Sequence, residues 1–267
     1  MQLLTPLVPD ASAPLGRANP VAKLAAAVVI LVVLFASLDG VTAAVVLAGL
    51  TALLPASGLG IRALFGRAWP VGITALSIGV FNVLFAAEQL GPTIVELGPL
   101  QIGGETMLNG AGLALRLLAI ALAGLLATAT SDPVDVADAL VQQLRVSPRF
   151  SVGVLAALRL IPLLAQEWQT LGMARRARGV DAGRSPLAAV GLFAGTLMAL
   201  LVGAIRRGSR MALAMEARGF GALPCRSVAR PQRMGAEDWG WIVGAALLAV
   251  GAVAISLALG TWRPLLG

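Results

Sequence analysis

Five long stretches of apolar, almost uncharged residues limit this chain to a membrane fold. Each approaches or exceeds the ~20 helical residues that cross the hydrocarbon core of a bilayer. With 58% hydrophobic and 12% charged residues, the chain is also far more apolar than a soluble domain. We therefore expect an all-α integral membrane protein with about five transmembrane helices, at residues 21–37, 41–57, 69–87, 106–130 and 239–259.

The rare residue types exclude several kinds of site. The chain has no His, no Tyr and a single cysteine, Cys225, which excludes a Cys/His metal cluster, a catalytic Cys–His pair and an internal disulfide. Aromatic residues make up only 4% of the chain, although nucleic-acid sites stack bases on aromatic side chains. We therefore attribute the net charge of +7 to membrane orientation and protein docking, with no nucleic acid as partner.

The chain also lacks the residues that ATP hydrolysis and ion coupling would require. No Gly-x-x-x-x-Gly-Lys-Ser/Thr sequence is present, so the chain has no P-loop for ATP. Glu88 and Glu105 lie at the ends of expected spans, which leaves no carboxylate within the membrane for a proton relay. Arg116 is the one strongly charged residue deep in an expected span. We interpret it as a buried structural post that fixes helix packing, or as an internal hydrogen-bonding group that pairs with Asn82 or a backbone carbonyl.

The positive charges indicate the orientation of the chain. Fourteen of the 20 Lys and Arg residues lie between Ser131 and Asp238, whereas the loop at 88–105 has three Glu and no Lys or Arg. Because cytoplasmic segments are enriched in Lys and Arg, we expect a cytoplasmic N-terminus and an uncleaved first membrane helix. The expected parts are a cytoplasmic N-terminal arm (1–20), transmembrane helices 1–4 (21–130), a cytoplasmic domain (131–238), and the last transmembrane helix with the C-terminus (239–267).

Three capping residues followed by proline predict the helices of the cytoplasmic domain: Asp132-Pro133, Ser147-Pro148 and Ser185-Pro186. The first helix is short and amphipathic, with acidic residues at its start, and we expect it along the membrane surface. The other two, 148–178 and 186–218, are rods of roughly 45–50 Å, longer than the ~30 Å hydrocarbon core. Each has an apolar first half and an Arg-rich second half, and we expect the two rods to cross beneath the membrane.

A sixth membrane span at residues 187–204 is the alternative, because this segment carries no charge. It would place Arg178 and Arg218 on opposite sides of the membrane and six arginines outside the cell. The orientation bias argues against that arrangement and favours the cytoplasmic rods.

A similar seven-residue sequence motif lies at the C-terminal end of both rods. Residues 174–180 read Ala-Arg-Arg-Ala-Arg-Gly-Val, and residues 214–220 read Ala-Met-Glu-Ala-Arg-Gly-Phe. One such end is explained by ordinary capping, since glycine often follows a helix and arginine complements the helix dipole. Two ends with the same phrasing favour docking: the alanine allows close approach, the glycine ends the helix, and the arginine offers a planar fork to carboxylates or carbonyls. The candidate docking residues are Ala177, Arg178, Gly179, Ala217, Arg218 and Gly219.

These motifs resemble the transmembrane T component (EcfT/CbiQ-like) of energy-coupling factor transporters, which are ABC transporters. The likeness covers most of residues 105–221 and rests mainly on the paired Ala-Arg-Gly ends. It extends to residues 113–118, 131–140, 157–164 and 206–221, and weakly to Asn19-Pro20 with Lys23. The chain departs from the pattern in having Met215 where the first copy has Arg175, and in following the first motif with Val180-Asp181 rather than an aromatic residue.

The resemblance implies a non-catalytic scaffold in a prokaryotic cell membrane. Such a scaffold joins two ABC-type ATPase subunits, identical or different, to a small membrane-embedded substrate-binding S component for vitamin or metal-ion uptake. The cytoplasmic domain would then be a coupling domain of one short and two long helices. Ala177, Arg178 and Gly179 would engage one ATPase, and Ala217, Arg218 and Gly219 the other. The chain itself would bind no cofactor, because ATP and Mg bind at the partner ATPases, and the S component would choose the substrate.

Two other classes remain as alternatives. A self-sufficient secondary carrier would need internal repeats of spans and polar gaps at mid-membrane. A polytopic membrane enzyme would need clustered acids or nucleophiles; Asp132, Asp135 and Asp138 do cluster, but capping at the start of a helix explains them.

Overall fold

The computed structural model describes residues 13–58, 60–86, 91–97, 100–144, 147–180, 183, 185–220 and 231–264. The chain forms two compact units, which we call the bundle unit (Met1–Ala139 with Gln232–Gly267) and the rod unit (Leu140–Pro231). These boundaries fall inside the expected cytoplasmic domain. Cys225 and Asp181 lie outside the described residues.

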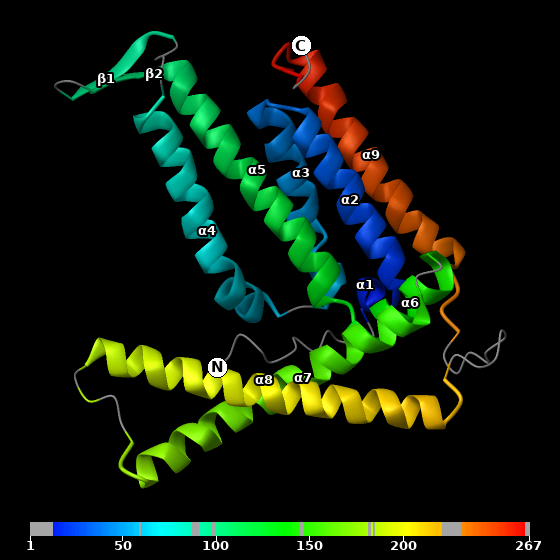
Figure 1. The fold of residues 1–267 in the computed structure, drawn as a ribbon. Coiled ribbons are helices and arrows are strands. Elements are labelled where there is room, and N and C mark those ends of the chain that lie inside the picture. The colour runs from blue at the N-terminus through cyan, green and yellow to red at the C-terminus, as the bar shows by residue number, and fades with distance from the viewer. Residues whose placement is uncertain are drawn as a thin grey trace. The chain divides into compact units, whose positions relative to one another are not determined.

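The bundle unit consists of helices and one small hairpin (Figure 1). Its elements in chain order are α1 (Pro14–Arg17), α2 (Pro20–Ala36), α3 (Gly40–Ala52), the 3-10 turn η2 (Leu54–Ser57), α4 (Ile61–Leu84), β1 (Thr93–Leu97), β2 (Leu100–Gly103), α5 (Gly104–Ala129), α6 (Pro133–Leu144, which crosses into the rod unit) and α9 (Ala236–Ala258). The expected all-α membrane fold is confirmed, since each of the five expected spans contains a helix.

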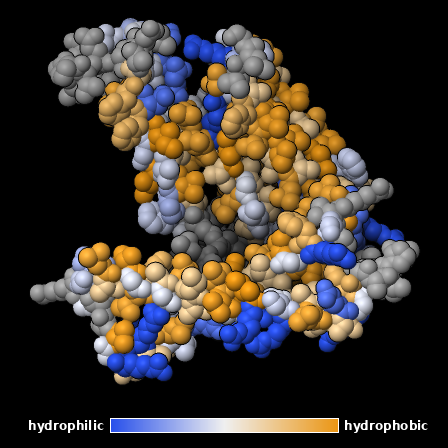
Figure 2. Space-filling view, in the orientation of Figure 1, coloured by the Kyte–Doolittle hydropathy of each residue, from blue (hydrophilic) through white to orange (hydrophobic). Residues whose placement is uncertain are grey.

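The core of the bundle unit lies between α2, α3, α5 and α9. Leu34, Val46 and Ala119 are almost completely buried there, together with small residues of α9 such as Ala252. Large apolar side chains also cover the outer faces of α2 and α9 (Figure 2), and Leu247 of α9 is 67% exposed. A helix surface of that kind suits hydrocarbon rather than water.

Glycines bring α4 and α3 close to α5. A Cβ added to Gly110 of α5 would lie 2.8 Å from the carbonyl oxygen of Gly79 in α4, and one added to Gly112 would lie 2.9 Å from Cα of Gly40. Close backbone approach at small residues is a common way to pack helices in a membrane.

The second and third spans differ from their predictions. α3 ends at Ala52, and the chain continues as η2, because Pro55 lacks the N–H that a longer helix would need. The apolar part of the third helix, residues 68–84, begins within one residue of the span predicted from Trp69, but the helix itself, α4, already begins at Ile61 and continues through Pro70. The hydroxyl of Thr74 donates to the Pro70 carbonyl at 2.8 Å, a polar contact next to the kink-prone position.

The expected loop at 88–105 contains a hairpin. β1 and β2 pair antiparallel, with Leu97 opposite Leu100 and Thr93 opposite Gly103, and the register shifts between Thr93 and Val95. Strands of five and four residues do not change the all-α class. Among the helices described, α5, α8 and α9 are long and apolar enough to cross a membrane; residues 20–36, 40–52 and 68–84 form shorter apolar helices.

The rod unit is built on α7 (Pro148–Ala177) and α8 (Pro186–Ala217), which cross (Figure 1). Both begin at the predicted prolines and end within one residue of the predicted ends. Ser185 caps α8, since its Oγ accepts the amide of Ala188 at 3.4 Å. The expected cap at Ser147 is wrong, because its side chain makes no capping hydrogen bond; proline at the first helical position already removes one of the free N–H groups there.

Candidate functional site

The end of α7 has the hydrogen-bond pattern of a Schellman motif. Arg178 closes the helix and Gly179 takes a left-handed backbone conformation at φ +72°. The amide of Gly179 donates to the carbonyl of Arg176 at 3.0 Å, and the amide of Val180 donates to the carbonyl of Arg175 at 3.0 Å. Glycine is needed here because a Cβ strains this backbone conformation.

The end of α8 repeats that geometry forty residues later. Arg218 closes the helix and Gly219 also has φ +72°. The amide of Gly219 donates to the carbonyl of Glu216 at 2.9 Å, and the amide of Phe220 donates to the carbonyl of Met215 at 3.0 Å. The repeated phrase therefore produces the same backbone twice.

Both ends are open surfaces. All six predicted docking residues are exposed, and a Cβ added to Gly179 or Gly219 would meet nothing within 4 Å. Among the residues that the structure describes, no hydrogen bond or ion pair engages the guanidinium of Arg178 or Arg218. The arginines are thus available to a partner, and the glycines serve the turn rather than packing inside this chain.

The structure does not bring the two motifs together. Within the rod unit, the C-terminal ends of α7 and α8 lie on opposite sides of their crossing (Figure 1). Two partners, or two subunits of one partner, can therefore be contacted separately.

Polar contacts join α7 to α8 where the two helices cross. The sequence did not predict these contacts. Nη1 of Arg175 donates to the carbonyl of Leu192 at 2.7 Å and to Oγ1 of Thr196 at 2.6 Å. The rings of Trp168 and Phe193 pack edge to face beside it, with centroids 5.3 Å apart. These contacts join the second half of α7 to the first half of α8.

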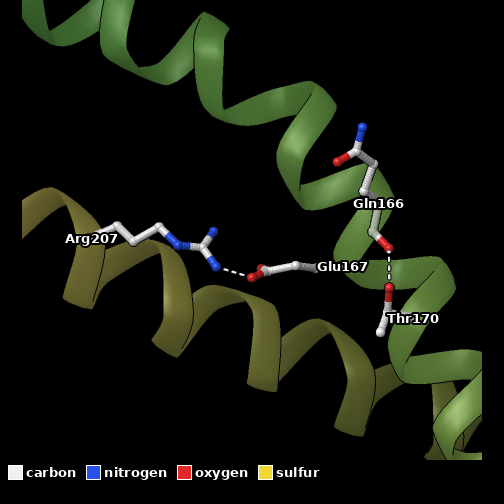
Figure 3. Close-up of polar contacts among 4 residues, drawn as sticks. All are labelled: Gln166, Glu167, Thr170 and Arg207. Carbon is white, nitrogen blue, oxygen red and sulfur yellow. Dashed lines mark hydrogen bonds and ion pairs between the residues drawn. The ribbon is translucent and has the colours of Figure 1, made fainter.

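An ion pair between Glu167 of α7 and Arg207 of α8 forms a second brace (Figure 3). The same figure shows the hydroxyl of Thr170 donating to the carbonyl of Gln166, one turn back along α7, at 3.0 Å. One sequence signal pointed to this pair. Glu167 is the only acidic residue between Pro148 and Ala177, and an isolated acid in an Arg-rich helix has a cation as its natural partner.

Arg116 lies in the bundle unit, remote in sequence from both motifs. Its Nη2 donates to the carbonyl of Ser37, just after α2, so the observed partner is a backbone carbonyl and not Asn82. Asp39 follows two residues later and caps α3. Burial acts to raise the pKa of Asp39, but hydrogen bonds from the Thr42 amide and the Ser256 hydroxyl outweigh it and hold the pKa below its ordinary value. The contacts of Arg116 and Asp39 join α5, α2, α3 and α9 at one end of the unit.

In the described part of the chain, no three His, Cys, Asp or Glu side chains lie close enough together to hold a metal ion. Each of the two helix ends in the rod unit carries an exposed alanine, a glycine that fixes the end of the helix and an exposed guanidinium, which are groups that can contact another protein.

Comparison with known proteins finds relatives that match most of the chain. The CbiQ family, described as cobalt transport protein, matches residues 11–227. The energy-coupling factor transporter transmembrane protein EcfT of Thermosediminibacter oceani is 30% identical over 207 residues, which cover 74% of this chain and 76% of that one. Proteins of the same name are 33% identical over 159 residues in Heliobacterium modesticaldum (56% and 59% covered) and 27% identical over 251 residues in Exiguobacterium sibiricum (91% and 94% covered).

The family match includes both Ala-Arg-Gly helix ends and every helix from α1 to α8. The resemblance drawn from the motifs is thereby confirmed. The chain belongs to the CbiQ/EcfT family of transmembrane components of energy-coupling factor transporters.

Proposed function

We propose that this chain is the scaffold and energy-coupling subunit of an energy-coupling factor ABC importer. It transmits ATP-driven motion of two ATPase subunits to a substrate-binding S component that takes up a vitamin or a metal ion. The bundle unit lies in the cell membrane of a prokaryote, and the N-terminus faces the cytoplasm, as the gathering of basic residues in 131–238 favours.

The observation that carries the proposal is the pair of matching helix ends. Each presents a small alanine, an exposed arginine and a glycine that stops the helix in the same backbone geometry. An ATPase dimer offers the same groove twice, whether its subunits are identical or merely similar, so two copies of one tip suit it. Arg178 and Arg218 would each enter a groove lined by carboxylates or carbonyls, which a guanidinium recognises through its planar fork.

The rods suit the transmission of force. At 1.5 Å per residue, helices of 30 and 32 residues are about 45–48 Å long. The Arg175 and Glu167–Arg207 contacts fasten them where they cross, so a displacement of one tip moves both rods. ATP and Mg remain with the partner subunits, and this chain supplies neither a cofactor nor a catalytic group.

Charge reversal at the tips tests the proposal. We expect Arg178→Glu combined with Arg218→Glu to abolish co-purification of the ATPases, because each glutamate would repel the carboxylates of its groove. Each single variant should weaken co-purification less than the double variant does. The measurement is the amount of ATPase retained per tagged chain after detergent extraction and washing.

The matched control is Arg206→Glu, which reverses an exposed arginine in the middle of α8 and should leave the ATPases bound. The double variant must still insert into the membrane at the parent's level. If it retained the ATPases as well as the parent does, docking through these ends would be disproved.

A further inference from the structure

A buried lysine joins two helices at one end of the bundle unit. Lys23 is the only lysine in the chain, and it is 4% exposed in the first turn of α2. Its Nζ donates to the carbonyl of Thr130 at 2.8 Å and to the carbonyl of Gly16 at 3.4 Å. Thr130 directly follows α5, so the cation sits on the carbonyl end of that helix, where the dipole favours positive charge.

A buried carboxylate joins the neighbouring helix starts. Asp238, 8% exposed, lies in the first turn of α9. Its Oδ2 accepts the amide of Gly235, which caps α9, and its Oδ1 accepts the amide of Asn19, which caps α2, at 2.8 and 2.6 Å. The anion therefore lies against two helix N-termini, both of which favour negative charge. Asp238 and Asp135 also act electrostatically on Lys23.

These contacts lie inside the bundle unit, close in sequence to the two points where the chain leaves it and re-enters it. The chain leaves the bundle unit after Ala139 and re-enters it at Gln232. Thr130 and Asp135 belong to the outgoing segment, and Gln232 and Asp238 to the returning one. Nε2 of Gln232 donates to Oδ1 of Asp135 at 3.3 Å, which ties the two segments to each other as well as to α2.

We infer that Lys23 and Asp238 form a clamp that fixes the bundle-unit ends of both connections to the start of α2, so that force arriving along either connection reaches this membrane helix. The inference rests on the proposed function, since the force comes from ATPases at the helix ends. Lys23 is a positioning residue in this scheme. Its ammonium holds the outgoing connection, and the Asp238 carboxylate holds the returning one.

Loss of either charge releases one connection. Lys23→Met keeps the length of the side chain but leaves the Thr130 carbonyl without its cation. Asp238→Asn removes the charge and keeps one oxygen, so only one of the two backbone amides, of Gly235 or of Asn19, retains its acceptor. A hydrogen bond to a charged group contributes enough free energy for its loss to raise the population of the released junction by about tenfold or more.

Pulsed electron paramagnetic resonance measures that population without knowledge of the transported substrate. The complex with its ATPases is prepared in lipid nanodiscs with Cys225→Ser and spin labels at Val243→Cys of α9 and Met173→Cys of α7, two exposed positions, one in each unit. We expect Lys23→Met to broaden the distribution of label-to-label distances while the ATPases remain bound. Asp238→Asn should broaden it as well, because the charge and one of the two amide hydrogen bonds at the helix starts are lost.

The matched control is Arg263→Gln, which removes an exposed cation paired with Glu105 at 3.8 Å. It should leave the distribution unchanged. A lowered melting temperature in the Lys23 and Asp238 variants with an unchanged distance distribution would overturn the clamp and leave both residues as ordinary packing contacts. If Lys23→Met does not fold, Asp238→Asn decides the matter by the same criterion. Failure of the parent chain to retain ATPases would instead refute the proposed function, and the clamp with it.

Discussion

Arg175 and Met215 occupy the same position in the repeated phrase and yet do different things. Their backbone carbonyls have the same role, accepting the amides of Val180 and Phe220. Only the side chain of Arg175 reaches across to the other rod, where it bonds Leu192 and Thr196. The difference between the two copies therefore has a cause inside this chain and requires no difference between the two proposed ATPase sites.

Replacing Arg175 should loosen the crossing while leaving the helix end intact. Arg175→Met imitates the second copy and removes two hydrogen bonds from a charged group, each of which contributes about 1.5–3 kcal/mol. We expect faster amide hydrogen exchange near Trp168 and Thr196, measured by mass spectrometry on the detergent-solubilised chain.

Arg176→Met is the matched control, since Arg176 is exposed and its Nε donates to the Gly172 carbonyl within its own helix at 3.3 Å. Equal exchange rates in the two variants would show that Arg175 does not brace the rods.

Prolines were the main signal from which the starts of the helices could be predicted. Pro133, Pro148 and Pro186 each begin a helix, as expected from a capping residue followed by proline. Pro70 follows Trp69, which is not a capping residue, and it lies inside α4, where residues 61–69 already form the preceding turns. Pro162, inside α7, likewise follows an apolar residue, Ile161, so the residue before the proline distinguishes these two from the three prolines that begin the predicted helices.

The candidate docking site also has a part that the sequence predicts and a part that it does not. The helix ends at Gly179 and Gly219 were predictable because their geometry depends only on adjacent residues. The braces were not, because Arg175 contacts residues 17 and 21 positions away and Arg207 pairs with Glu167 across 40 positions. Such contacts depend on where the rods cross, and periodicity fixes the face of a helix but not the crossing point.

The close approach of α4 and α5 gives a prediction about packing. Gly110→Val should destabilise the bundle unit by about 1–3 kcal/mol, the typical cost of inserting atoms into a packed interface. The physical reason is the carbonyl of Gly79, which stands 2.8 Å from the position of the new Cβ. The measurement is the midpoint of thermal unfolding in detergent.

Gly124→Val provides the control within the same helix, because a Cβ at Gly124 would meet nothing within 4 Å. It should leave the midpoint nearly unchanged. Similar losses in the two variants would mean that valine disturbs α5 itself rather than its contact with α4.

For the molecule as a whole, the proposed function requires that the C-terminal ends of α7 and α8 face the same side of the membrane. Length and composition qualify α8 as a membrane span, as they do α5 and α9. A span there would separate Arg178 from Arg218 by the bilayer, and one pair of cytoplasmic ATPases could then reach only one of them. The Arg-rich second halves of both rods favour the cytoplasm for both ends.

Cysteine accessibility tests this orientation directly. In a Cys225→Ser background, Arg178→Cys and Arg218→Cys are each treated with a membrane-impermeant thiol reagent in right-side-out and inside-out vesicles. Because both ends belong to the cytoplasmic side in the proposed function, we expect labelling of both only in inside-out vesicles. Thr93→Cys, at the exposed start of the hairpin between α4 and α5, should label only in right-side-out vesicles. Labelling of Arg178→Cys and Arg218→Cys from opposite sides would establish α8 as a membrane span, and the two helix ends would then no longer serve one pair of ATPases.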